Sequence, residues 1–189
     1  MIVLASQSPR RRELLAQAGF TFIVRAPAVE ELHQPGESPA AYVERLAAAK
    51  AAAVQASGGA SDDEWILAAD TTVVVDAHIL EKPTSPADAA RMLRLLSGRD
   101  HFVLTAVCLR QGSRQWSAVE STLVRFSPLS ESEIIAYAAS GEPLDKAGAY
   151  AIQGLASRFI PRIEGCYFNV VGLPISLVYR LLRDAGYPA

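Results

Sequence analysis

The sequence is poor in cysteine and histidine, from which many metal sites and nucleophilic systems are built. Its two cysteines, Cys108 and Cys166, lie far apart and form neither a CxxC pair nor a cluster with histidine. Isolated cysteines are typical of small buried residues in a reducing compartment, rather than of a disulfide framework or a zinc site. The three histidines, His33, His78 and His101, have no partner at the HxxxH spacing. A histidine metal site and a Ser/His nucleophile therefore lack support.

Long apolar runs and a basic surplus are also missing. No apolar stretch approaches the length that spans a bilayer, and the run at residues 2–5 is too short for the core of a signal peptide. We therefore expect a cytoplasmic protein with no membrane partner. Lysine and arginine number 18 against 20 aspartates and glutamates, so no positive surplus attracts nucleic acid. Any site for an anion must be local.

Half of the 189 residues are apolar, which is enough for one generous domain or two small lobes. Five helices are predicted. A serine followed by proline is a common start signal, and it occurs at Ser8, Ser38 and Ser85. Ser130 and Glu133 form a capping box for a fourth helix. The predicted helices cover residues 9–18, 39–56, 86–96, 131–140 and 174–185.

The remaining apolar runs predict strands. Residues 65–69 form a continuous apolar strand that ends at Asp70, followed by a hairpin with arms at residues 71–75 and 79–80. An antiparallel ribbon is predicted at residues 102–110 and 115–126, and single strands at residues 2–5, 20–24, 159–163 and 167–171. This order indicates an α/β fold with a mixed, largely antiparallel central sheet flanked by helices, in two lobes around a cleft.

Arginines occupy the start of the first predicted helix, where free backbone N–H groups and the helix dipole favour an anion instead. Arg11 also begins the apolar stripe of that helix, three residues before Leu14, so its cation points inward. A bound phosphate would explain Arg10 and Arg11 in this turn. The alternative is that these arginines are solvated, or paired with Glu13 or Glu30.

Three more charged residues have both a functional and an ordinary explanation. Lys50 falls on the apolar stripe of the second helix, although a lone lysine also commonly extends its ammonium to water. Asp70 places a carboxylate at the end of a central strand, beside which catalytic acids lie, but Asp before Thr-Thr is also an ordinary turn former. Glu31, beside Glu30 in an acidic loop, is either solvated or an oxygen ligand of the kind Mg²⁺ requires.

Lys82 adds a cation just beyond a predicted strand, where either a phosphate site or an exposed turn is expected. The chain lacks the GxxxxGK[ST] phosphate loop and the GxGxxG dinucleotide turn. If the protein handles nucleotides, it does so without those two devices.

Seven short segments, in order along essentially the whole chain, resemble the Maf family of nucleoside triphosphate pyrophosphatases. They are Leu4-Ala-Ser-Gln-Ser-Pro-Arg-Arg11, Ala69-Asp70-Thr71, Leu80-Glu-Lys-Pro83, Leu95-Leu-Ser-Gly98, Asp145-Lys-Ala-Gly-Ala-Tyr150, Ile152-Gln-Gly154 and Val171-Gly-Leu-Pro174. Each segment alone is a weak signal, whereas seven co-linear ones are a specific match. The resemblance implies a single Maf-type domain over residues 1–189, a divalent metal cation (Mg²⁺ or Mn²⁺) and, in many members, a homodimer.

Within that family, the stretch 145–154 is similar to the subgroup that hydrolyses dTTP and UTP to the nucleoside monophosphate and pyrophosphate. Two alternatives remain open at this point: a 7-methyl-GTP pyrophosphatase, and a non-catalytic nucleotide-binding regulator of cell division and septum formation. Carried over one position at a time, the resemblance implies that Asp70 is the proton acceptor and that Glu31 and Asp70 hold the metal. It also implies three substrate-selecting residues, namely Arg10, Thr71 and Gln153. The residues implied to bind phosphates are Arg11, Lys50 and Lys82.

Three residues depart from the family's usual pattern. Ala69 and Ala151 stand where glycine is common, and Cys166 stands where serine is usual. The two alanines add methyl groups beside expected site residues. We expect these groups to affect the preference among substrates more than the activity itself.

Overall fold

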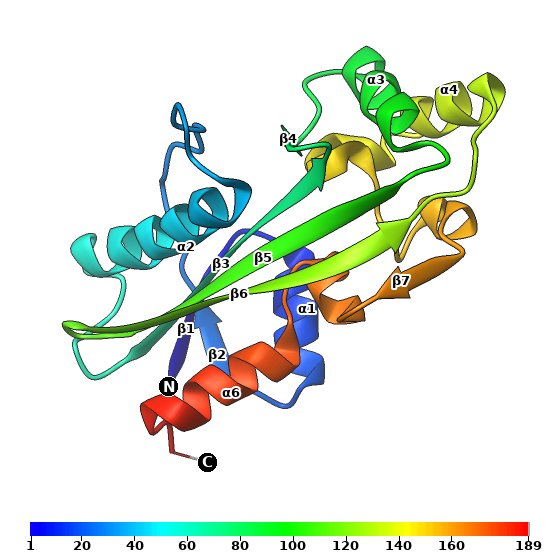
Figure 1. Ribbon diagram of the computed structural model, residues 1–189. Helices are drawn as coiled ribbons and strands as arrows, with labels where there is room; N and C mark the ends of the chain where they lie inside the picture. The colour runs from blue at the N-terminus through cyan, green and yellow to red at the C-terminus, as the bar shows by residue number, and fades with distance from the viewer. Residues whose placement is uncertain (189) are drawn as a thin grey trace. The chain divides into compact units, whose positions relative to one another are not determined.

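The computed structural model describes residues 1–188, which divide into two compact units. Unit 1 consists of Met1–Asp70, Thr105–Glu120 and the C-terminal segment that begins at Gly172. Unit 2 consists of Thr71–Leu104 and Ser121–Val171. Three long strands contribute residues to both units (Figure 1): β3 (Trp65–Val75), β5 (Asp100–Gln111) and β6 (Arg114–Arg125).

The strands form one seven-stranded sheet in the order β2-β1-β3-β5-β6-β7, with β4 paired to β3. The first strand, β1 (Ile2–Ala5), runs parallel to both of its neighbours, β2 (Phe22–Val24) and β3. Antiparallel pairing joins β3 to β4 (His78–Leu80), and β6 to β7 (Arg162–Glu164). The expected α/β fold with a mixed sheet flanked by helices is confirmed.

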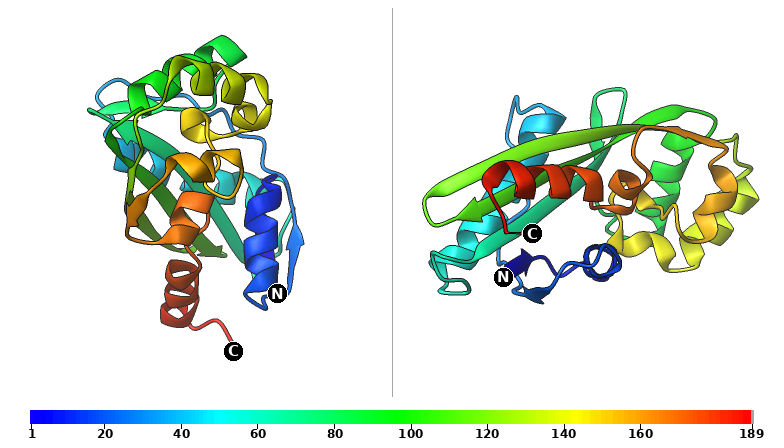
Figure 2. Two further views of the ribbon diagram at one scale, coloured as in Figure 1. Left: turned by 90° about the vertical axis from the view of Figure 1, so that its right-hand side faces the viewer. Right: turned by 90° about the horizontal axis from the view of Figure 1, so that it is seen from below.

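Helices cover both faces of the sheet in unit 1. All four residues of β1 are fully buried, as expected of a parallel strand with helices on either side. The connection from β1 to β2 and the connection from β2 to β3 run across the sheet in opposite directions. Because connections between parallel strands are right-handed, the helices within these two connections lie on opposite faces of the sheet. Accordingly, α1 (Pro9–Gln17) and α2 (Pro39–Ala56) lie on opposite sides of the strands (Figure 1, Figure 2).

The predicted helix starts are confirmed because they depend on local hydrogen bonds. Ser8, Ser38, Ser85 and Ser130 all accept a hydrogen bond from the backbone N–H three residues on. Three of these helices begin at proline, and Glu133 completes the capping box of the fourth. The later helices are α3 (Pro86–Leu96), α4 (Glu131–Ala139) and α6 (Ile175–Ala185). Within residues 1–188, none of the helices has the length and apolar character needed to cross a bilayer.

The prediction that a strand ends at Asp70 is wrong. Strand β3 continues for five residues beyond it, because Thr71–Val75 consists entirely of β-branched residues and gains an antiparallel partner in β4. The predicted hairpin is present, with a tight turn at Asp76 and Ala77, whose φ angles of 47° and 65° suit a two-residue connection. Asp70 therefore lies inside a long strand instead of at its end.

The prediction of a strand at residues 167–171 is also wrong, because this segment forms a short helix, α5 (Tyr167–Val171). Its fully buried Asn169 donates hydrogen bonds from Nδ2 to Val103 O at 2.9 Å and to Thr122 Oγ1 at 2.8 Å. These tertiary contacts override the strand preference of the aromatic and β-branched residues around Asn169. The strand expected at residues 159–163 is reduced to β7, since Leu155–Phe159 forms a 3₁₀ helix.

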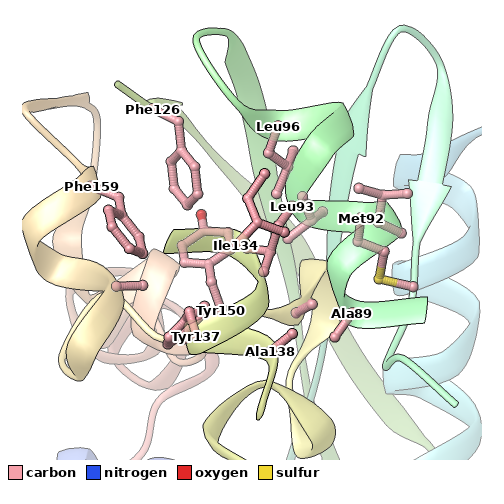
Figure 3. Close-up of a cluster of buried hydrophobic side chains, with 14 of the residues drawn as sticks. Ala89, Met92, Leu93, Leu96, Phe126, Ile134, Tyr137, Ala138, Tyr150 and Phe159 are labelled. Carbon is pink, nitrogen blue, oxygen red and sulfur yellow. The ribbon is translucent and has the colours of Figure 1, made fainter. Parts of the chain in front are cut away.

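The core of unit 2 lies where α3 and α4 pack against aromatic side chains (Figure 3). The ring of Phe126 lies with its centroid 4.9 Å from that of Tyr150, and the Tyr137 and Phe159 centroids are 5.8 Å apart. These pairs meet edge to face, the arrangement that aromatic quadrupoles favour. The core therefore fixes the positions of two tyrosine hydroxyl groups.

One histidine is buried in this core. His101 is 1% exposed, and its Nε2 lies 2.8 Å from the hydroxyl of Tyr150. Burial lowers the pKa of His101 to about 4, although the nearby Asp100 carboxylate acts in the opposite direction. The native state therefore holds this imidazole neutral over a range in which the unfolded chain protonates it.

The free energy of unfolding is expected to fall as the pH falls from 6.5, the ordinary pKa of histidine, to about 4. The contribution of neutral His101 to the free energy of unfolding is complete above this pH window. The difference between its native and unfolded pKa values corresponds to a loss of about 3 kcal/mol of this free energy across the window. Urea unfolding of the wild type and His101→Gln across the window measures the effect. A slope as steep in His101→Gln as in the wild type would contradict it.

Candidate functional site

Arg11 points into unit 1, as its place on the α1 stripe predicts. Its Nε donates to the carbonyl oxygen of Gly172 at 2.8 Å, and its Nη1 donates to that of Ala69 at 2.8 Å. A weaker contact joins Nη1 to the hydroxyl of Ser6 at 3.5 Å. The alternative that Arg11 is simply solvated is wrong. The guanidinium links the start of α1 to the residue directly before Asp70.

Lys50 is the most buried cation of the site. It is 8% exposed, and its Nζ lies 2.5 Å from Asp70 Oδ1 and 2.5 Å from Glu31 Oε1. The alternative that its ammonium reaches water is therefore wrong. One ammonium on α2 joins a carboxylate from β3 to a carboxylate from the acidic loop, so three residues far apart in the sequence meet at one point.

Asp70 is the carboxylate buried beside this ammonium, with an exposed fraction of 6%. Burial raises the pKa of Asp70 above its ordinary value, and the Glu31 carboxylate acts in the same direction. The positive charges of Lys50 and Arg11 oppose the rise without cancelling it. A carboxylate with a raised pKa accepts a proton more readily than an exposed aspartate does, which is what a general base requires.

The loop that carries Glu31 is fastened to α2. Arg45 donates through Nε and Nη2 to the two carboxylate oxygens of Glu37, at 2.7 and 2.8 Å, and through Nη2 to Leu32 O at 2.9 Å. Tyr42 donates from its hydroxyl to Glu31 O at 3.4 Å. The Arg45 guanidinium lowers the pKa of Glu37 to about 2. One helix therefore supplies Lys50 and also holds Glu31 against it.

Sequence reasoning missed this support from Tyr42, Arg45 and Glu37. The only local signal is that Arg45 follows Glu37 by eight residues, across a helix start. Such spacing is common on solvated helix surfaces, so it could not single out the pair.

Of the remaining predicted residues, Arg10, Lys82 and Gln153 lie at or beside ends of elements, whereas Thr71 lies inside β3. Arg10 is half-buried in the first turn of α1, in unit 1. Thr71 directly follows Asp70 in β3 and is half-buried, Lys82 is exposed two residues after β4, and Gln153 is exposed in a turn of unit 2. The structure brings Arg11, Glu31, Lys50 and Asp70 together within unit 1. The roles of Arg10, Thr71, Lys82 and Gln153 stay predictions.

The two cysteines differ in burial. Both thiols are free, and burial raises the pKa of Cys108 to about 11, which keeps it protonated and unreactive. Cys166 is half-buried, with its backbone N–H donating to Thr122 Oγ1 at 3.0 Å. Cys108 is the buried, inert residue that the sequence predicts, whereas Cys166 is partly accessible.

The carboxylates of the site could supply some of the ligands of a divalent cation. Within residues 1–188, no three or more His, Cys, Asp and Glu side chains converge closely enough to hold a metal by themselves. Glu31 and Asp70 nevertheless lie close together, because both contact the Lys50 ammonium. Mg²⁺ typically takes one or two carboxylates and fills its remaining positions with water and substrate phosphates. Two carboxylates meet this minimum, so a cation here would take its remaining ligands from water and substrate.

Comparisons with known proteins give the same family as the sequence motifs. The family model described as Maf-like protein matches residues 1–185. The chain is 51% identical to a dTTP/UTP pyrophosphatase of Koribacter versatilis, over 98% of this chain and 94% of that protein. It is 53% identical to one of Vibrio cholerae over 96% of each chain, and 52% identical to one of an Anaeromyxobacter species over 99% of this chain and 90% of that protein.

A solved structure, that of the Staphylococcus aureus Ham1 protein, matches 66% of this chain and 71% of its own with a TM-score of 0.46 and 16% identity. That likeness is too distant to carry an argument. The half-identical relatives, by contrast, match nearly the whole chain, and the residues matched by the family model include all the site residues described above. This chain belongs to the Maf family.

Proposed function

We propose that the chain hydrolyses dTTP and UTP to the nucleoside monophosphate and pyrophosphate. Proteins about half identical to it over nearly their whole length carry that activity in their names. The observation that carries the proposal is Lys50, buried between Asp70 and Glu31 with Arg11 nearby. Buried cations beside a carboxylate with a raised pKa suit the attack of water on a polyanionic substrate.

In the proposed reaction, Asp70 accepts a proton from the attacking water. The water oxygen bonds to the α-phosphorus, the bond from this phosphorus to the bridging oxygen breaks, and pyrophosphate leaves. Negative charge grows on the bridging oxygen, so cations fixed in advance lower the barrier. Arg11, Lys50 and Lys82 are proposed to bind the phosphates.

A divalent cation, Mg²⁺ or Mn²⁺, is part of the proposal. Glu31 and Asp70 would hold it, and when bound it would neutralise charge on the phosphates. Tyr42 and Arg45 keep Glu31 in place through the backbone of its loop, and the Lys50 ammonium contacts both carboxylates.

Substrate choice is proposed to depend on Arg10, Thr71 and Gln153. We also propose a cytoplasmic protein that is a single Maf-type domain over residues 1–189 and forms a homodimer. Size-exclusion chromatography with light scattering tests the homodimer, because a single species at the 20.2 kDa monomer mass would contradict it.

A panel of nucleotides tests the activity directly. The purified chain is given dTTP, UTP, dATP, CTP, GTP and 7-methyl-GTP with Mg²⁺, with Mn²⁺ or with EDTA, and pyrophosphate is measured. Fastest release from dTTP and UTP, lost with EDTA, is the expected result. Fastest release from 7-methyl-GTP would contradict the substrate class. Binding of nucleotides without pyrophosphate release from any of them would favour a regulator.

A further inference from the structure

Two side chains of unit 2 hold the turn that carries Gln153. Across this turn, the N–H of Gly154 donates to the carbonyl oxygen of Ala151 at 3.1 Å. At its start, the N–H of Ala151 donates to the Tyr137 hydroxyl at 3.2 Å, and just after its end, the N–H of Leu155 donates to Glu142 Oε2 at 3.1 Å. The Tyr137 hydroxyl in turn donates to Glu142 Oε1 at 2.7 Å. The contacts form one continuous network from Ala151 to Leu155.

Both partners are fixed by contacts of their own. Tyr137 is 1% exposed in the aromatic core, where its ring meets that of Phe159 (Figure 3). Glu142 donates from its backbone N–H to the hydroxyl of Ser140 at 3.3 Å, and its carbonyl oxygen accepts from the ammonium of Lys146 at 2.7 Å. The Tyr137 ring and the Glu142 backbone are therefore held in place, and the Tyr137 hydroxyl holds the Glu142 carboxylate.

Gly154 shows how closely this support fits the turn. A Cβ atom at this position would lie 2.3 to 2.5 Å from the carboxylate atoms of Glu142, nearer than such atoms approach one another. A side chain at this position would therefore displace the Glu142 carboxylate from its present place. The Glu142 carboxylate thus contacts the residue that directly follows Gln153.

We propose that Tyr137 and Glu142 are positioning residues that set substrate selectivity by holding the turn of Gln153. The inference rests on the proposed function, in which Gln153 helps to select the substrate. Gln153 is exposed, so the backbone turn is what sets where its side chain starts. A turn held at both ends fixes where the Gln153 side chain starts and so narrows the region that its amide can reach, which favours a base with matching hydrogen-bond groups over one without them.

The hydrogen bonds predict which substitutions matter. Tyr137→Phe keeps the buried ring but removes the hydroxyl, which leaves the Ala151 N–H and Glu142 Oε1 without that partner. Glu142→Ala removes the support of Leu155 as well. Glu142→Gln keeps one acceptor oxygen of nearly the same position, and we expect it to retain part of the effect.

The test compares kcat and KM for dTTP with those for CTP, a pyrimidine nucleotide outside the proposed class. In Tyr137→Phe and Glu142→Ala, the dTTP preference in kcat/KM is expected to fall about tenfold, mainly through a higher KM for dTTP. Glu142→Gln should lie between Glu142→Ala and the wild type. Amide hydrogen exchange at Ala151 and Leu155 is expected to speed up by a similar factor, since their N–H groups lose partners.

Ile134→Val is the matched control, because Ile134 lies in the same core and on the same helix as Tyr137 without a hydrogen bond to the turn. It should lower the melting temperature and leave the dTTP preference unchanged. An unchanged preference in Tyr137→Phe and Glu142→Ala, or unchanged exchange at both amides, would overturn the inference. If the wild type hydrolyses no nucleotide, the proposed function fails, and amide exchange alone then decides whether the pair holds the turn.

Discussion

Asp70→Asn is expected to lower pyrophosphate release from dTTP and UTP by roughly 10²–10⁴-fold, the usual contribution of a general base. The asparagine keeps the size of the side chain and an oxygen that accepts from Lys50, but it cannot take a proton from water. Initial rates at saturating substrate and metal measure the change. No other carboxylate in unit 1 combines this burial with direct contact to Lys50 among the described residues.

The fold should survive this change. Because burial raises the pKa of Asp70, the native state binds its proton more tightly than the unfolded chain does. The ionised carboxylate thus lowers the free energy of unfolding as the pH rises above its ordinary value of 3.8, and asparagine removes that cost. Asp63→Asn, which changes an exposed carboxylate of unit 1, is the matched control and should keep full activity. Substantial turnover by folded Asp70→Asn would refute the role of Asp70.

Lys50→Met should have the largest effect on stability. Removing one partner of a buried ion pair leaves an uncompensated charge, which typically costs 3–5 kcal/mol, and we expect about 3 kcal/mol because Glu31 is partly exposed. Without the ammonium, Asp70 and Glu31 repel each other across the space it occupied. The loss should shrink at acid pH, where Asp70 takes up a proton. Urea unfolding at neutral and acid pH measures both effects.

A double-mutant cycle separates the ion pair from the packing of the lysine stem. Asp70→Asn in the Lys50→Met background removes the stranded carboxylate, so the double variant should be more stable than Lys50→Met alone. Lys50→Arg is a useful companion, since it keeps the charge while changing its geometry. Strictly additive effects of Lys50→Met and Asp70→Asn on the free energy of unfolding would contradict direct coupling of the two side chains.

Features that depend on near neighbours in the chain could be predicted from the sequence. The serine caps at Ser8, Ser38, Ser85 and Ser130 each bond to a backbone group three residues away, so local sequence determines them. The inward positions of Arg11 and Lys50 follow from helical periodicity alone. Periodicity could not say what these cations meet, because Asp70 and Gly172 reach them through tertiary folding.

Features that depend on distant contacts could not be predicted. Helix α5 forms where a strand was expected because Asn169 bonds to two strands. The support of Glu31 by Arg45 joins an acidic loop to a helix face. Asn, Arg and Glu are also common on solvated surfaces, so their identity alone does not indicate such contacts.

The most direct test of Asp70 as the general base is the pH dependence of kcat/KM for dTTP, measured over the range in which the fold is intact by circular dichroism. The account predicts an acid limb whose apparent pKa lies above 3.8, the ordinary value for aspartate, and no such limb in the residual activity of Asp70→Asn. A wild-type profile that stays flat until the protein unfolds, or the same limb in Asp70→Asn, would contradict it.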